Sequence, residues 1–164
     1  MPRFRAAGHH HGADDRPEAD SELVRDQLKR AKTDIDTPRE TTLLPGPTGE
    51  SNRLTSHARG TILCLGPDTG AQAAIATAAG CAAVEVTGRL LPGALSSLSG
   101  MAVVAYDGSE EMARAYRIAL AGREGPIIPL AGSAELAGYA VLERHLCVDT
   151  TASGGNASLL AAAE

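Results

Sequence analysis

Short apolar runs alternate with helix-forming stretches over most of the chain after residue 60. Apolar, β-branched runs predict strands, and we expect them at residues 61–65, 82–86, 101–106, 127–130 and 145–149. Helix-forming sequence lies between them at residues 71–79, 110–121 and 133–140, and Gly80 is placed to end the first of these helices. Continuous apolar strands that alternate with helices predict an α/β fold, a parallel sheet with helices on both faces.

The first quarter of the chain has a different pattern, because it is polar and charged. Residues 21–32 could form three helical turns with Ser21 as the N-cap, but they hold too few apolar side chains for a core of their own. Two prolines and two glycines in residues 41–49 predict turns there. We expect three parts: a polar linker or loosely docked helix (1–40), an α/β domain (41–149) and a C-terminal tail (150–164).

Composition and charge exclude several classes of protein. The chain has 164 residues, which suits one domain, and only 2% of them are aromatic, so Ala, Leu, Val and Ile must form the core. The net charge is −5, and the last lysine is Lys32. Nucleic-acid-binding domains normally present a basic face, so we expect no nucleic-acid partner. No apolar run reaches the roughly 20 residues of a membrane span, and residues 1–20 lack the apolar region of a secretory signal.

Histidines and cysteines offer little catalytic chemistry. Residues 9–11 are three adjacent histidines without supporting ligand spacing, and a solvated tract is favoured over a metal site. The three cysteines are odd in number and lack CxxC spacing, which favours reduced, mostly buried thiols in a cytoplasmic protein. His57 and His145 have no nucleophile context, so structural roles are favoured for both.

The turn Gly66–Gly70 follows a predicted strand and precedes a helix, a position where α/β folds often bind phosphates. It matches neither GxGxxG nor GxxxxGK[ST], and Asp68 would repel a phosphate. A plain turn is favoured. The alternative is an autonomous small nucleotide-binding protein or oxidoreductase that uses this turn.

The tail around Gly154-Gly155 holds small polar residues that cannot anchor themselves in a core. From composition alone it is either a frayed end or a segment that needs a partner surface.

Two separated motifs carry a resemblance to a known family. Leu44–Glu50 (LPGPTGE) followed by Asn52, and Asp149 leading into Gly154–Leu159 (GGNASL), resemble the C-terminal region of proline utilization A. These long bacterial flavoenzymes join a proline dehydrogenase barrel to an L-glutamate-γ-semialdehyde dehydrogenase, with FAD and NAD as cofactors. The longer members add a C-terminal domain of the aldehyde dehydrogenase superfamily. The chain resembles that domain from about Leu43 onward, which implies a Rossmann-like sheet.

The resemblance also implies that catalysis is lost in this chain. The oxyanion-donating asparagine of working aldehyde dehydrogenases would fall at Thr69, and the lysine that holds the coenzyme ribose would fall at Val86. The domain with the nucleophilic cysteine has no counterpart. We therefore expect no catalytic, cofactor-binding or metal-binding residue here.

What the resemblance implies instead is a structural domain that supports the semialdehyde dehydrogenase and closes its substrate tunnel. The partner would be that catalytic domain, in cis or in trans, and the chain would be a fragment, a split subunit or a truncated reading frame. A regulatory module that binds an unrelated protein through the tail is a further alternative. The expected interface residues lie in the tail: Thr150, Gly154, Gly155, Asn156, Ser158 and Leu159.

Overall fold

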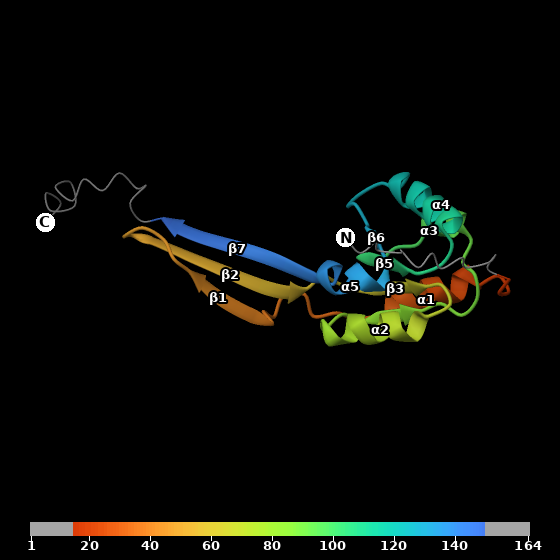
Figure 1. Cartoon of the computed structure of the whole chain (residues 1–164), viewed down its shortest axis with the longest axis horizontal. Coiled ribbons are helices and arrows are strands. Elements are labelled where there is room, and N and C mark those ends of the chain that lie inside the picture. The colour runs from red at the N-terminus through yellow and green to blue at the C-terminus, as the bar shows by residue number, and fades with distance from the viewer. Residues whose placement is uncertain (1–14, 150–164) are drawn as a thin grey trace, which may run out of the picture.

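The computed structural model describes residues 15–149, and it contains an α/β body with a parallel sheet of four strands (Figure 1). The strands are β3 (Ile62–Leu65), β4 (Ala83–Glu85), β5 (Val103–Tyr106) and β6 (Leu130–Ala131), in the spatial order β4-β3-β5-β6. Successive side chains of a strand face opposite sides of the sheet. Ile62 and Cys64 therefore belong to one core cluster, whereas Leu63 and Leu65 belong to the other.

Helices cover both faces of this sheet, which confirms the predicted fold class. One face packs against α2 (Thr69–Ala78) and α5 (Ser133–Tyr139). The other packs against α1 (Ser21–Arg30), α3 (Pro92–Leu95) and α4 (Glu110–Ala121). Within residues 15–149, no helix is long and apolar enough to cross a membrane.

Helix α1 begins one residue earlier than the sequence suggested. The N-cap is Asp20, not Ser21, because the Asp20 carboxylate accepts hydrogen bonds from the backbone N–H groups of Glu22 and Leu23. Val24 and Leu28 are almost fully buried in the core cluster that also holds the side chains of α3 and α4. The segment before residue 40 thus supplies core side chains to the body.

Two helix ends are fixed by local chemistry, and the first lies where the sequence places it. Gly80 follows α2 with a φ of +80°, the left-handed conformation that glycine adopts most readily. Ser109 caps α4, and its hydroxyl accepts a hydrogen bond from the Met112 N–H at 3.3 Å.

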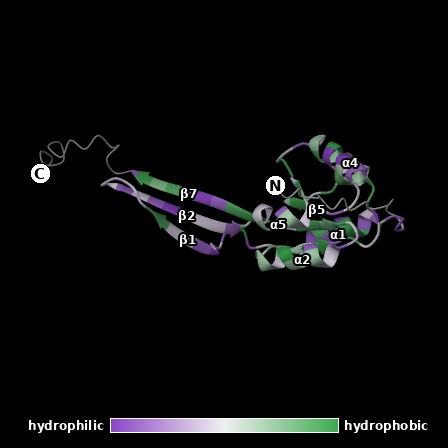
Figure 2. Cartoon of the chain, in the orientation of Figure 1, coloured by the Kyte–Doolittle hydropathy of each residue, from purple (hydrophilic) through white to green (hydrophobic). Residues whose placement is uncertain are grey.

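An antiparallel three-stranded sheet, which we call the arm, projects away from the body (Figure 1). It consists of β1 (Glu40–Leu44), β2 (Glu50–Ala58) and β7 (Val141–Asp149) in the order β1-β2-β7. Hydrophobic and hydrophilic residues are interspersed along it (Figure 2).

The arm corrects two predictions. Residues 41–49 are not all turn, because Glu40–Leu44 is a strand and only residues 45–49 connect it to β2. The prolines lie in that connection, so they interrupt no ladder hydrogen bond. The last strand begins at Val141, not at residue 145, and it pairs with β2 in the arm, outside the parallel sheet.

Candidate functional site

The carboxyl ends of β3 and β5 form the place where an open α/β sheet would hold a ligand. After β3 the chain adds β4 on one side and β5 on the other, so the strand order reverses between β3 and β5. Ligands of such sheets bind outside the carboxyl ends of the strands at this switch point. The turn Gly66–Gly70 follows β3, and Asp107 follows β5.

Tyr106 fills this position with its own side chain. Gly66 has a φ of +102°, and a Cβ built on it would lie 3.2 Å from Cδ2 of Tyr106. A Cβ on Gly108 would collide with the Tyr106 hydroxyl. The ring is nearly buried and packs edge-to-face on Tyr116, with centroids 5.1 Å apart. The two glycines thus admit the tyrosine ring at the point where a nucleotide would approach the backbone.

Asp107 is engaged in a structural network beside this tyrosine. Its carboxylate accepts hydrogen bonds from Gln72 Nε2 at 2.8 Å, from the Ser133 N–H at 2.8 Å, and from the Ser133 hydroxyl. Gln72 is fully buried. The network ties α2, β5 and α5 together, so Asp107 holds the carboxyl end of the sheet in shape.

The charges at this end do not suit a dinucleotide. Thr69 donates a hydrogen bond to Glu85 at 3.3 Å, which places a carboxylate beside the start of α2. Asp68 adds a second acid, and its side chain forms no cap on α2. Val86, where the resemblance puts the coenzyme lysine, is buried in the core. The two acids disfavour the phosphates of NAD, and Val86 offers no lysine to its ribose, although Glu85, at the end of β4, is the kind of carboxylate that binds a dinucleotide ribose.

The N-terminal segment closes the same end from outside. Arg16 donates a hydrogen bond to the Gly66 carbonyl oxygen at 2.6 Å. Next to it, the Ala19 N–H donates a hydrogen bond to the Arg89 carbonyl oxygen at 3.0 Å. The Arg89 N–H in turn donates to the Pro17 carbonyl oxygen at 2.8 Å. Sequence analysis missed Arg16 and Tyr106, because neither lies in a recognisable motif.

The tip of the arm places the first resembling motif beside Asp149, the residue that leads into the second. Glu50 pairs with Asp149 across β2 and β7, so residues 99 positions apart meet there. Asn52 is mostly buried and donates a hydrogen bond to the Glu50 carboxylate, which also accepts from Cys147 Sγ at 3.6 Å. A Cβ on Gly46 would lie 2.8 Å from Asn52 Nδ2, so the connection folds closely over this side chain.

Exposed apolar side chains lie on one face of the arm. The register aligns Leu43, Arg53 and Leu146 across the three strands, and Val148 follows on the same face of β7. Leu43 is 72% exposed, Leu146 54% and Val148 47%. The expected interface residues, from Thr150 to Leu159, begin directly after Asp149 and lie outside the described residues.

Cysteine chemistry is weak in the described part of the chain. Burial raises the pKa of Cys64 to about 12, so its thiol stays protonated at neutral pH. Cys81 is buried and its Sγ lies 3.2 Å from the Ala140 carbonyl oxygen, whereas Cys147 is exposed, which corrects the expectation of a buried core thiol. Between residues 15 and 149, no group of three His, Cys, Asp or Glu side chains could hold a metal ion.

Comparisons with known proteins identify relatives. No protein-family model matches the chain. It is 33% identical to the bifunctional protein PutA of Escherichia coli (strain K12) over 146 residues and to that of Salmonella typhimurium over 144 residues. Each alignment covers 72% of this chain, which spans about a tenth (11%) of the length of these relatives. A crystal structure of bifunctional proline utilization A matches 68% of this chain and 14% of its own, with 26% identity and a TM-score of 0.48.

Proposed function

We propose that this chain, which is homologous to a segment of proline utilization A, is a non-catalytic assembly domain that supports an L-glutamate-γ-semialdehyde dehydrogenase. The observation that carries the proposal is the pairing of Glu50, which ends the first resembling motif, with Asp149, which leads into the second, at the tip of an exposed arm. In this role the arm and the tail bind the catalytic dehydrogenase, in cis or in trans, and help to close its substrate tunnel.

The carboxyl end of the parallel sheet supports a role without a cofactor. Tyr106 occupies the switch point, and Glu85 and Asp68 would repel a phosphate. We therefore assign FAD and NAD to the catalytic domains of the relatives and none to this chain. Calorimetric titration with NAD⁺ should give a dissociation constant above about 1 mM, and a micromolar constant would favour the alternative, a nucleotide-binding protein.

The arm supports a role in assembly. Both outer strands, β1 and β7, are edge strands, because β2 lies between them. Long exposed edges with apolar side chains are templates for pairing with another chain, and proteins normally cover them. Leu43, Leu146 and Val148 offer exposed apolar side chains, on either side of Arg53, to a dehydrogenase surface.

The test is binding of the full chain to the isolated semialdehyde dehydrogenase module of a proline utilization A, by analytical ultracentrifugation. The double variant Leu43→Asp, Leu146→Asp should weaken association by at least about tenfold. Ile118→Asp is the matched control, because Ile118 is an equally exposed apolar residue on α4 of the body.

Semialdehyde-dependent NAD⁺ reduction in the same mixtures should rise with the full chain and not with the double variant. Failure of the wild-type chain to associate, or equal weakening by the control, would contradict the proposal.

A further inference from the structure

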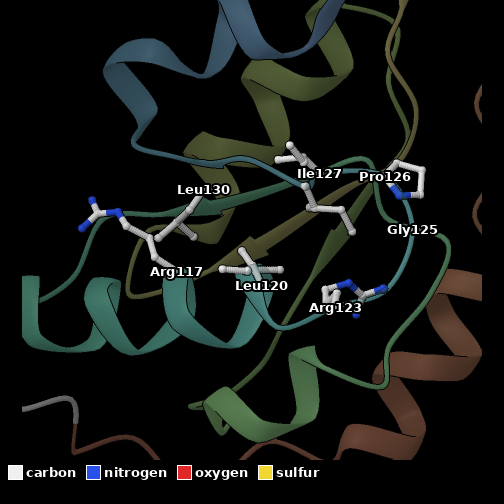
Figure 3. Close-up of a pocket in the computed structure, with 9 residues that line it drawn as sticks. Arg117, Leu120, Arg123, Gly125, Pro126, Ile127 and Leu130 are labelled. Atoms are coloured by element: carbon white, nitrogen blue, oxygen red, sulfur yellow. The ribbon is translucent and has the colours of Figure 1, made fainter.

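A second feature of the body lies at the opposite end of the sheet, where the strands begin. A hollow of about 510 Å³ opens between the base of the arm and the residues that precede β5. Its lining includes Arg59, Met101, Arg123, Ile127, Ile128 and Leu142. The loop from α4 to β6 separates it from a smaller hollow over Leu120 and Leu130, in which Ile127 stands across from the α4 side chains (Figure 3).

Two arginines of this hollow form no ion pair within residues 15–149. Arg59 Nη2 donates to the Val141 carbonyl oxygen at 3.3 Å, and Arg123 Nη1 donates to the Leu95 carbonyl oxygen. The Nε of each is buried without a hydrogen-bond partner, and neither guanidinium forms an ion pair with any residue from 15 to 149. Each guanidinium has four Nη–H donors, of which one is used, so three remain for an anion, whereas the Nε–H is buried.

Most of the rest of the wall is apolar. Met101, Ile128, Leu142 and Pro126 line the hollow, and Ile127 at its rim is 95% exposed. Glu124 also lies on the lining, and its negative charge disfavours a dianion there. A volume of this size is within the range of about 300–1,000 Å³ that is usual for small-molecule sites with apolar walls and few polar groups.

We propose that this hollow is a binding site for a small monocarboxylate with a short apolar tail. Arg59 and Arg123 bind the carboxylate, for which the planar guanidinium is the preferred partner. Met101, Leu142 and Ile127 cover the tail. Leu43, Leu146 and Val148 of the proposed assembly role do not line the hollow, so each proposal can fail without the other.

The first experiment uses the full chain labelled with ¹⁵N and titrated with hexanoate. The Nε–Hε signals of Arg59 and Arg123 and the amide signals of Met101 and Ile127 should shift saturably at millimolar concentrations. Hexanol and hexylammonium test whether the tail alone suffices, and inorganic phosphate tests whether any anion does. Absence of saturation, or equal shifts with hexanol or phosphate, would overturn the proposal.

Variants locate the site. Arg59→Gln and Arg123→Gln should each weaken hexanoate binding by at least about tenfold, and Ile127→Ser should weaken it less. Arg117→Gln is the matched control, because Arg117 lines only the smaller hollow and is already paired with Glu110 at 2.7 Å. If Arg59→Gln does not fold, Arg59→Lys keeps the charge and should weaken binding without abolishing it. Equal loss in Arg117→Gln would reject the assignment.

Discussion

The body and the arm are both built on sheets, but the central strands of the body are buried whereas the outer strands of the arm are exposed. All residues of β3 and β5 are buried, whereas every residue of β1 and seven of the nine residues of β7 are exposed. The body strands lie between two layers of helices, so their side chains stabilise this chain. The arm strands have no covering layer, so their side chains are available to another surface. The difference separates residues that maintain the fold from the exposed residues on which the proposed assembly role rests.

The largest effect should come from truncating the body sheet. Leu63 is fully buried between β4 and β5 neighbours, and Leu63→Ala should lower the free energy of unfolding by about 2–5 kcal/mol through lost burial and a cavity. Leu146→Ala in the arm should lower it by less than about 0.5 kcal/mol. Urea unfolding measures both, and equal losses would remove the distinction between the two regions.

The next effect concerns the network at the carboxyl end of the sheet. Asp107→Ala removes the acceptor for Gln72 and Ser133 and should lower the free energy of unfolding by about 2–3 kcal/mol. Asp26→Ala is the control, because Asp26 forms only an exposed ion pair with Lys29, and its loss should cost less than about 1 kcal/mol. A small effect of Asp107→Ala would mean that water replaces the carboxylate.

A third effect is the loss of stability at high pH caused by Cys64. Its pKa is raised by burial to about 12, above the reference of 9.0, so the unfolded chain releases this proton first. The contribution of this thiol to the free energy of unfolding is fully present below pH 9 and is lost as the pH rises from 9 toward 12. Between pH 8 and pH 10 the free energy of unfolding should fall in both proteins, and the fall should be about 1 kcal/mol larger in the wild type than in Cys64→Ala. Parallel pH profiles would contradict the buried thiol.

The smallest effect is on thiol reactivity at the arm tip. Cys147 is the exposed cysteine among those of the described residues, so a maleimide at pH 8 should label it before Cys64 or Cys81. Desolvation and then the neighbouring Glu50 raise the Cys147 pKa. Glu50→Gln should therefore increase the thiolate fraction and speed labelling roughly twofold. Equal labelling rates for Glu50→Gln and the wild type would mean that the Glu50 carboxylate does not act on this thiol.

Local sequence was sufficient for most of the body. The apolar runs at residues 61–65 and 101–106 mark strands because a sheet covered on both faces needs side chains that are apolar on both. Ser109 and Gly80 mark helix ends because their chemistry satisfies backbone groups locally. The strand Glu40–Leu44 was missed because its side chains are exposed, so neither burial nor strict alternation gives it a pattern.

The sequence by itself determined the α/β class, the family resemblance and the absence of a phosphate-binding motif, since each follows from residue types and their order along the chain. The tertiary structure decided the rest. Only folding sets Glu50 beside Asp149, Tyr106 against Gly66, and Arg59 beside the same hollow as Arg123. These contacts join distant segments through sheet register and helix packing, and no local preference of the chain encodes them.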